Sequence, residues 1–244
     1  MSRIKFLNTY VDNLTMDEAI KRIDELIIRN KPSYIVTPNV DHIVKLDVDI
    51  EFQNVYNEAD LILTDGMPLI WISKLKKNPI KEKISGSDLF PKVCKLASDK
   101  GYKVFLLGAA EGVAAKAAEN LKLKYSGLKV VGTYSPSYGF ENNKDEVERI
   151  IKIITDIKPD ILAVGLGAPK QEKFLYEFKD KLRVPVSLAI GASIDFEAGN
   201  VKRAPKWMQK SGLEWLYRLF KEPKRMFKRY LIDDMEIFRV ILKY

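Results

Sequence analysis

Six short apolar runs, separated by longer segments with helical periodicity, constrain the fold of this chain more than any other feature. Continuous runs of Val, Ile and Leu are typical of strands buried on both faces of a parallel sheet. Strands that alternate with helices form α/β folds. The sequence therefore predicts a doubly wound, mostly parallel α/β domain over residues 1–195, with helices on both faces of the sheet. The predicted strands are residues 33–37, 60–64, 102–108, 128–134, 160–167 and 184–191.

Local signals support this assignment. Thr15 and Glu18 have the spacing of a capping box at the start of a helix. The segment ENNKDEVERIIKIITDI predicts another helix, which ends before Pro159. The N-terminal segment IKFLNTYVDNL predicts a strand or a hairpin. Cys94 is the only cysteine, so it excludes a disulfide within the chain, and we expect it to be buried in a helix.

The pattern changes at about residue 196, where the apolar strand runs stop. Residues 196–244 predict an appendage of two or three helices, broken at Ser211-Gly212 and at Pro223. Helical spacing places one apolar set on the first main helix and another on the second. The first set is Leu213, Leu216, Tyr217 and Phe220, and the second is Phe227, Leu231, Met235, Phe238 and Leu242.

The appendage also carries most of the positive charge. Residues 203–230 contain nine Lys or Arg and two Glu, in a chain whose formal net charge is +8. A basic excess confined to one segment predicts an anionic partner there, which leaves nucleic acid, an anionic membrane and a phosphorylated substrate as alternatives. No helix-turn-helix or RNA-binding signature is present, and this disfavours nucleic acid.

Targeting signals are lacking. The N-terminus has no apolar core followed by a small-residue cleavage site, so we expect no signal peptide. No run approaches the roughly 18 apolar residues of a membrane span. A single cysteine is typical of the reducing cytoplasm. We therefore expect a cytoplasmic protein.

Polar residues follow two of the predicted strands. In open α/β sheets, ligands bind beyond the carboxyl ends of the strands. In VTPNVDH (36–42), Thr37 and Asn39 either cap a helix or face a ligand, and His42, the only histidine, is more often structural in such a place. In LTDGMP (63–68), Asp65 is placed either as a general base for a hydroxyl nucleophile or as the acid of an Asp-Gly turn. Both readings remain open from the spacing alone.

Two further strand ends are rich in small residues. In VGLGAPKQE (164–172), Lys170 falls where the third glycine of a dinucleotide fingerprint belongs, so a nicotinamide site is poorly supported. A glycine turn before a helix still suits a phosphate or a sugar, and Gln171 lies in the first turn of that helix. The segment AIGASIDFEAG (189–199) leads to Asp195, and its small residues allow a ligand to approach the backbone.

A possible metal motif is discounted. Asp47 and Asp49 have the D-x-D spacing with which many sugar-nucleotide transferases hold a divalent cation. The pair lies between two helical patterns instead of at a strand end, and Asp49 is well placed to cap the second helix. No Cys/His cluster offers a zinc site. We expect neither a metal nor another cofactor.

A series of motifs runs in order along nearly the whole chain: TPNVDH, LTDGMP, GSDLF, FLLG, YGF, VGLGAPKQE, GASIDFEAG and KRAPKWMQKSGLEWLYRLFKEPKRMFKRY. This series resembles the TagA/WecG/CpsF family of bacterial glycosyltransferases. The resemblance implies a Rossmann-like domain with a C-terminal appendage, and an inverting enzyme without a D-x-D metal site. Members of the family in Gram-positive bacteria transfer N-acetylmannosamine from its UDP derivative to GlcNAc-diphospho-undecaprenol, forming the β-1,4 disaccharide of the wall teichoic acid linkage unit.

The resemblance also implies roles for individual residues. Asp65 is the expected base for the acceptor 4-hydroxyl. The other expected substrate-binding residues are Thr37, Asn39, Gly108, Gln171, Asp195, Arg203, Arg218, Arg225 and Arg229, with the last three facing a diphosphate. Lys224 and Lys228 stand where relatives often carry Arg, so a bidentate phosphate contact is not expected from these two.

An acceptor with a polyprenyl chain stays in the bilayer, so the resemblance implies an enzyme peripherally associated with the inner face of the cell membrane. A basic amphipathic segment with Trp and Tyr suits that association, and its closure over the site would exclude water. Another UDP-sugar donor, such as the uronic acid, is the alternative within the family, and a homo-oligomer is left open. A nucleic-acid binder and a nicotinamide-dependent oxidoreductase are the alternatives outside it.

Overall fold

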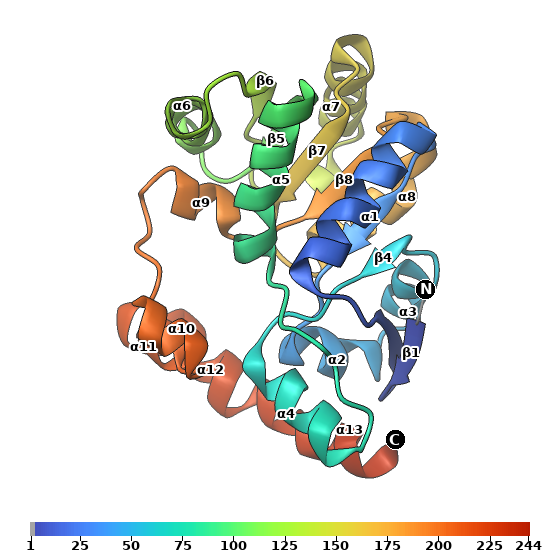
Figure 1. The fold of residues 1–244 in the computed structure, drawn as a ribbon, viewed down its shortest axis with the longest axis vertical. Coiled ribbons are helices and arrows are strands. Elements are labelled where there is room, and N and C mark those ends of the chain that lie inside the picture. The colour runs from blue at the N-terminus through green and yellow to red at the C-terminus, as the bar shows by residue number, and fades with distance from the viewer. Residues whose placement is uncertain (1–2) are drawn as a thin grey trace.

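The computed structural model describes residues 3–244, except for the side chains of Lys210 and Arg225. Its centre is a six-stranded sheet in the order β4-β3-β8-β7-β5-β6, in which all neighbouring strands are parallel (Figure 1). Each predicted strand run contains one of these strands, so the prediction of an α/β domain with a parallel sheet is confirmed. The strands are β3 (Tyr34–Val36), β4 (Leu61–Ile62), β5 (Lys103–Gly108), β6 (Lys129–Tyr134), β7 (Ile161–Gly165) and β8 (Val186–Ala189).

The N-terminal segment forms an antiparallel hairpin of β1 (Arg3–Phe6) and β2 (Thr9–Asp12), as expected. Asp12 at its end is buried, accepts two hydrogen bonds from the Arg3 guanidinium and accepts another from the Ile62 N–H at 2.8 Å. The predicted capping box follows, because the Thr15 hydroxyl and the Glu18 carboxylate each accept a backbone N–H of the other residue.

Both faces of the sheet are buried, because alternate strand residues contact different helices. In β5, Val104 and Leu106 face one apolar cluster while Phe105 and Leu107 face the other. Cys94 is buried in the first cluster, as predicted. That cluster lies under α1 (Met16–Arg29), α5 (Gly86–Lys100) and α6 (Val113–Lys124). The second lies under α2 (Val40–Leu46), α3 (Ile50–Asn57), α4 (Met67–Leu75), α7 (Lys144–Ile157) and α8 (Lys170–Leu182), with the 3-10 turn η1 (Phe140–Asn142) beside it.

The C-terminal segment is helical, with the predicted breaks at Ser211-Gly212 and before Pro223. The prediction of a single helix after Pro223 is wrong, because Ile232 has non-helical backbone angles (φ −125°, ψ −66°) and a 3-10 turn follows it. This break turns Ile237 and Val240 toward the core, where they are 8% and 0% exposed. The elements are α9 (Ser193–Glu197), α10 (Lys206–Lys210), α11 (Glu214–Lys221), α12 (Pro223–Leu231), η2 (Asp233–Glu236) and α13 (Ile237–Lys243).

Helices α10 to α13 run along one end of the molecule, against α2 and α4 (Figure 1). Gly212, in the turn between α10 and α11, has φ +75°, and a Cβ there would lie 2.8 Å from Met67 Cβ. Glycine therefore permits both the left-handed turn and its close contact with α4. By contrast, α9 packs against α5 and α6 of the sheet domain. The division of the chain after residue 195 stays a prediction.

Candidate active site

Two adjoining cavities lie beyond the carboxyl ends of strands β4, β3, β8 and β7, which are neighbours in the sheet. We call the one of about 400 Å³ the polar cavity and the one of about 450 Å³ the apolar cavity. The polar cavity is lined among others by Thr37, Asp41, His42, Gln171, Gly191 and Ser193. The apolar cavity is lined among others by Met67, Pro68, Trp215, Leu231, Met235 and Phe238.

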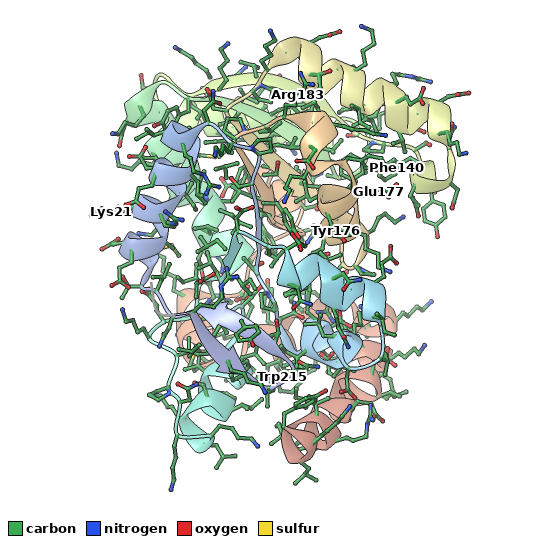
Figure 2. All side chains as sticks on the ribbon, turned by 90° about the vertical axis from the view of Figure 1, so that its right-hand side faces the viewer. Lys21, Phe140, Tyr176, Glu177, Arg183 and Trp215 are labelled. Atoms are coloured by element: carbon green, nitrogen blue, oxygen red, sulfur yellow. The ribbon has the colours of Figure 1, made fainter. Side chains whose placement is uncertain are left out.

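Residues of the C-terminal segment line both cavities. In Figure 2, Trp215, which lines the apolar cavity, lies in the lower part of the view, whereas Arg183, in the loop between α8 and β8, lies near the top. This position agrees with the rule that open α/β sheets bind ligands beyond the carboxyl ends of their strands. Six residues line both cavities and so mark their junction: Asn39, Asp65, Ser87, Phe196, Arg218 and Arg229.

Asp65 stands at this junction on the turn that follows β4. Its backbone N–H donates to the Pro38 carbonyl at 2.8 Å, and Gly66 after it has φ +99°. Burial raises the pKa of the Asp65 carboxyl to about 6, and the nearby carboxylates of Glu214 and Asp88 add to the rise while Lys83 and His42 oppose it. A carboxylate with such a pKa suits proton transfer near neutral pH.

The end of β3 supplies the amide and hydroxyl groups. Asn39 caps α2, since its Oδ1 accepts the His42 N–H at 3.3 Å, so the capping expectation is confirmed for this residue. The same Oδ1 lies 2.8 Å from His42 Nδ1 and accepts a hydrogen bond from Arg229 Nη2 at 3.3 Å. Thr37 is 8% exposed, and its hydroxyl lies 3.5 Å from the Ala189 carbonyl of β8.

The turn after β7 brings a second amide to the polar cavity. The Ala168–Pro169 peptide bond is cis, and α8 begins directly after it, as predicted. Gln171 Oε1 accepts the Gly191 N–H at 3.1 Å, and Gln171 Nε2 donates to Glu172 Oε1 at 2.7 Å. This amide therefore ties the β7 turn to the end of β8.

Gly108 has a packing role in the sheet. It ends β5 at φ +121°, and a Cβ there would overlap the carbonyl of Gly165 at the end of β7. Gly165 in turn leaves no room for a Cβ, which would lie 2.7 Å from the Gly191 carbonyl. Gly108 lines neither of the two cavities. Its predicted contact with substrate stays a prediction.

The expected arginines lie in different surroundings. Arg218 and Arg229 reach the junction of the cavities. Arg203 lines neither cavity and pairs with Asp88 at 2.8 Å and with Glu214 at 3.3 Å. The Arg225 side chain lies outside the part of the protein that the structure describes. Asp195 lies in α9 and also lines neither cavity.

Several charged residues of the site were not expected from the sequence, among them Lys83 and Asp234. Lys83 lines the apolar cavity, with its Nζ 2.7 Å from Asp88, and the only local signal is its place just before the GSDLF motif. Asp234 lines the same cavity, and burial raises the pKa of its carboxyl to about 6. It comes from the 3-10 turn η2, which interrupts a helix that the sequence predicted to be continuous.

Both carboxylates of the D-x-D pattern contact protein cations. Asp47 pairs with Arg239 at 3.0 Å and with Lys243 at 2.8 Å, so it joins α2 to α13. Asp49 accepts the Phe52 N–H as the cap of α3, as predicted, and pairs with Lys173 at 3.0 Å. Within residues 3–244, as far as they are described, no group of three or more His, Cys, Asp or Glu side chains could hold a metal ion.

Comparisons with known proteins bear on the whole chain. Residues 4–244 match the model of the glycosyl transferase WecG/TagA/CpsF family. The chain is 36% identical over 216 residues to the N-acetylglucosaminyldiphosphoundecaprenol N-acetyl-beta-D-mannosaminyltransferase of Bacillus spizizenii strain W23, covering 88% of this chain and 81% of the relative. Proteins of the same name from Bacillus subtilis strain 168 (34%, covering 75% and 69%) and Staphylococcus aureus strain MW2 (29%, covering 92% and 87%) are also similar.

Proposed function

This chain belongs to the glycosyl transferase WecG/TagA/CpsF family, and from that premise we propose that it transfers N-acetylmannosamine from UDP-N-acetylmannosamine to the 4-hydroxyl of GlcNAc-diphospho-undecaprenol. The names of its relatives support this acceptor and this sugar. The product would be the β-1,4 disaccharide of the wall teichoic acid linkage unit. The observation that carries the proposal is the position of Asp65, where a polar and an apolar cavity meet beside Arg218 and Arg229.

The chemistry of the two cavities supports one arrangement of the two substrates. The polar cavity offers hydroxyl, amide and backbone groups, including Thr37 and Gln171, which suit the sugar nucleotide. The apolar cavity suits the acceptor, because its walls of Trp215, Leu231 and Phe238 match the first units of a polyprenyl chain. The acceptor hydroxyl would then meet the donor sugar beside Asp65.

In this arrangement Asp65 acts as the general base. It takes the proton of the acceptor 4-hydroxyl while that oxygen forms a bond to the anomeric carbon of the donor. The bond from that carbon to the diphosphate breaks, UDP leaves with the electron pair, and the configuration inverts. Arg218 and Arg229, which the C-terminal segment brings to the junction of the cavities, would stabilise the charge that develops on the diphosphate.

We also propose peripheral association with the cytoplasmic membrane surface. Residues 3–244 contain no helix that is long and apolar enough to cross a membrane. Large apolar side chains of the C-terminal segment are exposed, among them Trp207 (63%), Phe220 (76%) and Leu242 (88%). Exposed apolar side chains beside lysines are typical of helices that lie in a membrane interface. They would keep the apolar cavity close to a lipid acceptor.

A UDP-release assay with a GlcNAc-diphospho-lipid acceptor and a panel of UDP-sugars tests the proposal. We expect release to depend on the acceptor and to be fastest with UDP-N-acetylmannosamine. A preference for its uronic acid would assign the enzyme to another surface-polysaccharide pathway, and acceptor-independent release would refute the proposed reaction. An arm with EDTA should keep its activity, because Asp47 and Asp49 already pair with cations, and strict metal dependence would contradict the metal-free reaction.

A further inference from the structure

We propose that His42 and Glu172 form a buried positioning pair that fixes the amide of Asn39, so that its NH2 group is offered as a hydrogen-bond donor to a substrate oxygen at the junction of the cavities. The proposal rests on the function proposed above only for the identity of that substrate. His42 and Glu172 act through Asn39 in this scheme, and neither is a catalytic residue.

The pair is buried beneath the polar cavity. His42 and Glu172 are 4% and 1% exposed, and His42 Nε2 lies 3.2 Å from Glu172 Oε1. The rings of Phe52 and Tyr56 pack against the imidazole, with centroids 5.9 and 6.3 Å away. Apolar residues of similar size would fill such a place at a lower desolvation penalty. A polar pair retained among aromatic rings therefore indicates a role other than packing.

The contacts of Asn39 fix the orientation of its amide. Its Oδ1 accepts hydrogen bonds from the His42 backbone N–H and from Arg229 Nη2, two groups that can only donate. The atom at this position must therefore be the oxygen. His42 Nδ1 lies 2.8 Å from the same oxygen and 3.4 Å from the Asn39 backbone N–H, and the shorter contact favours a proton on Nδ1 that is donated to Oδ1.

Glu172 is the hydrogen-bond partner of the other ring nitrogen, His42 Nε2. Its carboxylate oxygen Oε1 lies 3.2 Å from His42 Nε2 and so holds the ring in the plane that directs Nδ1 at Asn39. Glu172 Oε1 also accepts from Gln171 Nε2, so the pair joins the β7 turn to the β3 turn.

The NH2 group of Asn39 is left for a ligand. Asn39 is half-buried and lines both cavities, and its Nδ2 makes no hydrogen bond within the described part of the protein. Because the oxygen already has three donors, the amide cannot flip without losing them all. Two N–H donors held in this way suit an oxygen of a diphosphate or of a sugar.

The resting protein itself provides the first test, because His42 is the only histidine and gives one imidazole signal. In a 15N-labelled sample we expect Nδ1 to be protonated and coupled to its own hydrogen. A ring protonated only at Nε2 would overturn the proposal. This measurement needs no substrate, so it stands even if the proposed glycosyl transfer is refuted.

The second test is a double-mutant cycle in kcat/KM with UDP-N-acetylmannosamine, and in Kd for UDP. Glu172→Ala should lower kcat/KM about ten- to a hundredfold, the loss typical of a hydrogen bond to a charged group. Asn39→Ser keeps a helix-capping hydroxyl and removes the NH2 group. In the Asn39→Ser background, Glu172→Ala should have little further effect, whereas effects that multiply independently would refute the positioning role.

Two further variants complete the design. Glu172→Gln keeps the size of the side chain and its bond to Gln171, and should restore most of the activity lost in Glu172→Ala. Asp12→Asn is the matched control, because Asp12 is also a buried carboxylate with one cationic and one N–H partner but lines neither cavity. It should lower the melting temperature without changing kcat/KM. If Asp12→Asn and Glu172→Ala lower kcat/KM alike, the effect is a general loss of stability and the proposal fails.

Discussion

Replacing Asp65 with Asn should stabilise the protein while removing most of its activity. In the folded state burial raises the pKa of the Asp65 carboxyl to about 6, from an ordinary value of 3.8. Below pH 3.8 the carboxyl is protonated in both the folded and the unfolded chain and makes no difference to stability. Between pH 3.8 and pH 6 the carboxyl ionises readily only in the unfolded chain, so it destabilises the folded state more as the pH rises. Above pH 6 this destabilisation has reached its full size.

The size of the effect follows from the shift. A pKa rise of about two units corresponds to about 3 kcal/mol at pH 8, and this is an upper value because the cavity admits some water. Asn has nearly the same shape and no charge to bury. For a chain of this length, 3 kcal/mol corresponds to a rise in Tm of roughly 6–12 °C. Transfer activity should fall about 10²- to 10⁴-fold, the usual contribution of a general base.

Thermal unfolding of the wild type and of Asp65→Asn, measured by circular dichroism at pH 4 and pH 8, provides the assay. The variant should gain stability at pH 8 and lose most of that gain at pH 4, while still binding UDP. Asp156→Asn is the control, because that side chain is 64% exposed and should change Tm little at either pH. An equal Tm for wild type and Asp65→Asn at pH 8 would refute the desolvated carboxylate, and full turnover by the variant would refute the base.

Three other changes test the C-terminal segment. Asp47→Asn should weaken the contacts of α13 with α2, because the variant loses the ion pairs with Arg239 and Lys243, and amide exchange of residues 237–243 should become faster by about two- to fivefold. Unchanged exchange there contradicts the role of these ion pairs. Gly212→Ala should make the α10–α11 turn more sensitive to proteolysis, because the new Cβ would lie 2.8 Å from Met67 Cβ at φ +75°; a turn that resists protease like the wild type argues against the close contact. Deleting residues 202–244 should leave a folded sheet domain that neither transfers sugar nor binds anionic vesicles, and an active deletion variant would exclude Arg218 and Arg229 from the reaction.

The sheet was predictable because its signal is local and redundant. A strand buried on both faces needs a continuous apolar run, and all six such runs contain a strand of the structure. The break at Ile232 carried no such signal. Its neighbours have ordinary helical spacing, and the chain bends there because Ile237 and Val240 of α13 pack against the core, a tertiary reason that no local pattern contains.

The candidate site was predictable where a strand end places a polar residue directly. Asp65, Asn39 and Gln171 fall into this class, because the carboxyl ends of parallel strands meet at one edge of the sheet. Lys83 and Asp234 were not, since their approach depends on loops and on the way the C-terminal segment folds back. The spacing of His42 likewise indicated a structural residue, and its contact with Glu172, 130 residues further along the chain, was not visible.

Among the described side chains of residues 203–230, the positive charge is divided by residue type. Three arginines point inward: Arg218 and Arg229 line the cavities, and Arg203 pairs with Asp88. Four lysines of the same segment are exposed, namely Lys206, Lys221, Lys224 and Lys228. Guanidinium groups give fixed, bidentate contacts to phosphates, whereas ammonium groups on flexible stems suit a diffuse anionic surface. We therefore expect Arg218→Lys and Arg229→Lys to impair transfer although the charge is kept, and Lys221→Arg or Lys224→Arg to leave transfer and vesicle binding unchanged. Equal tolerance at all four positions would show that only net charge matters in this segment.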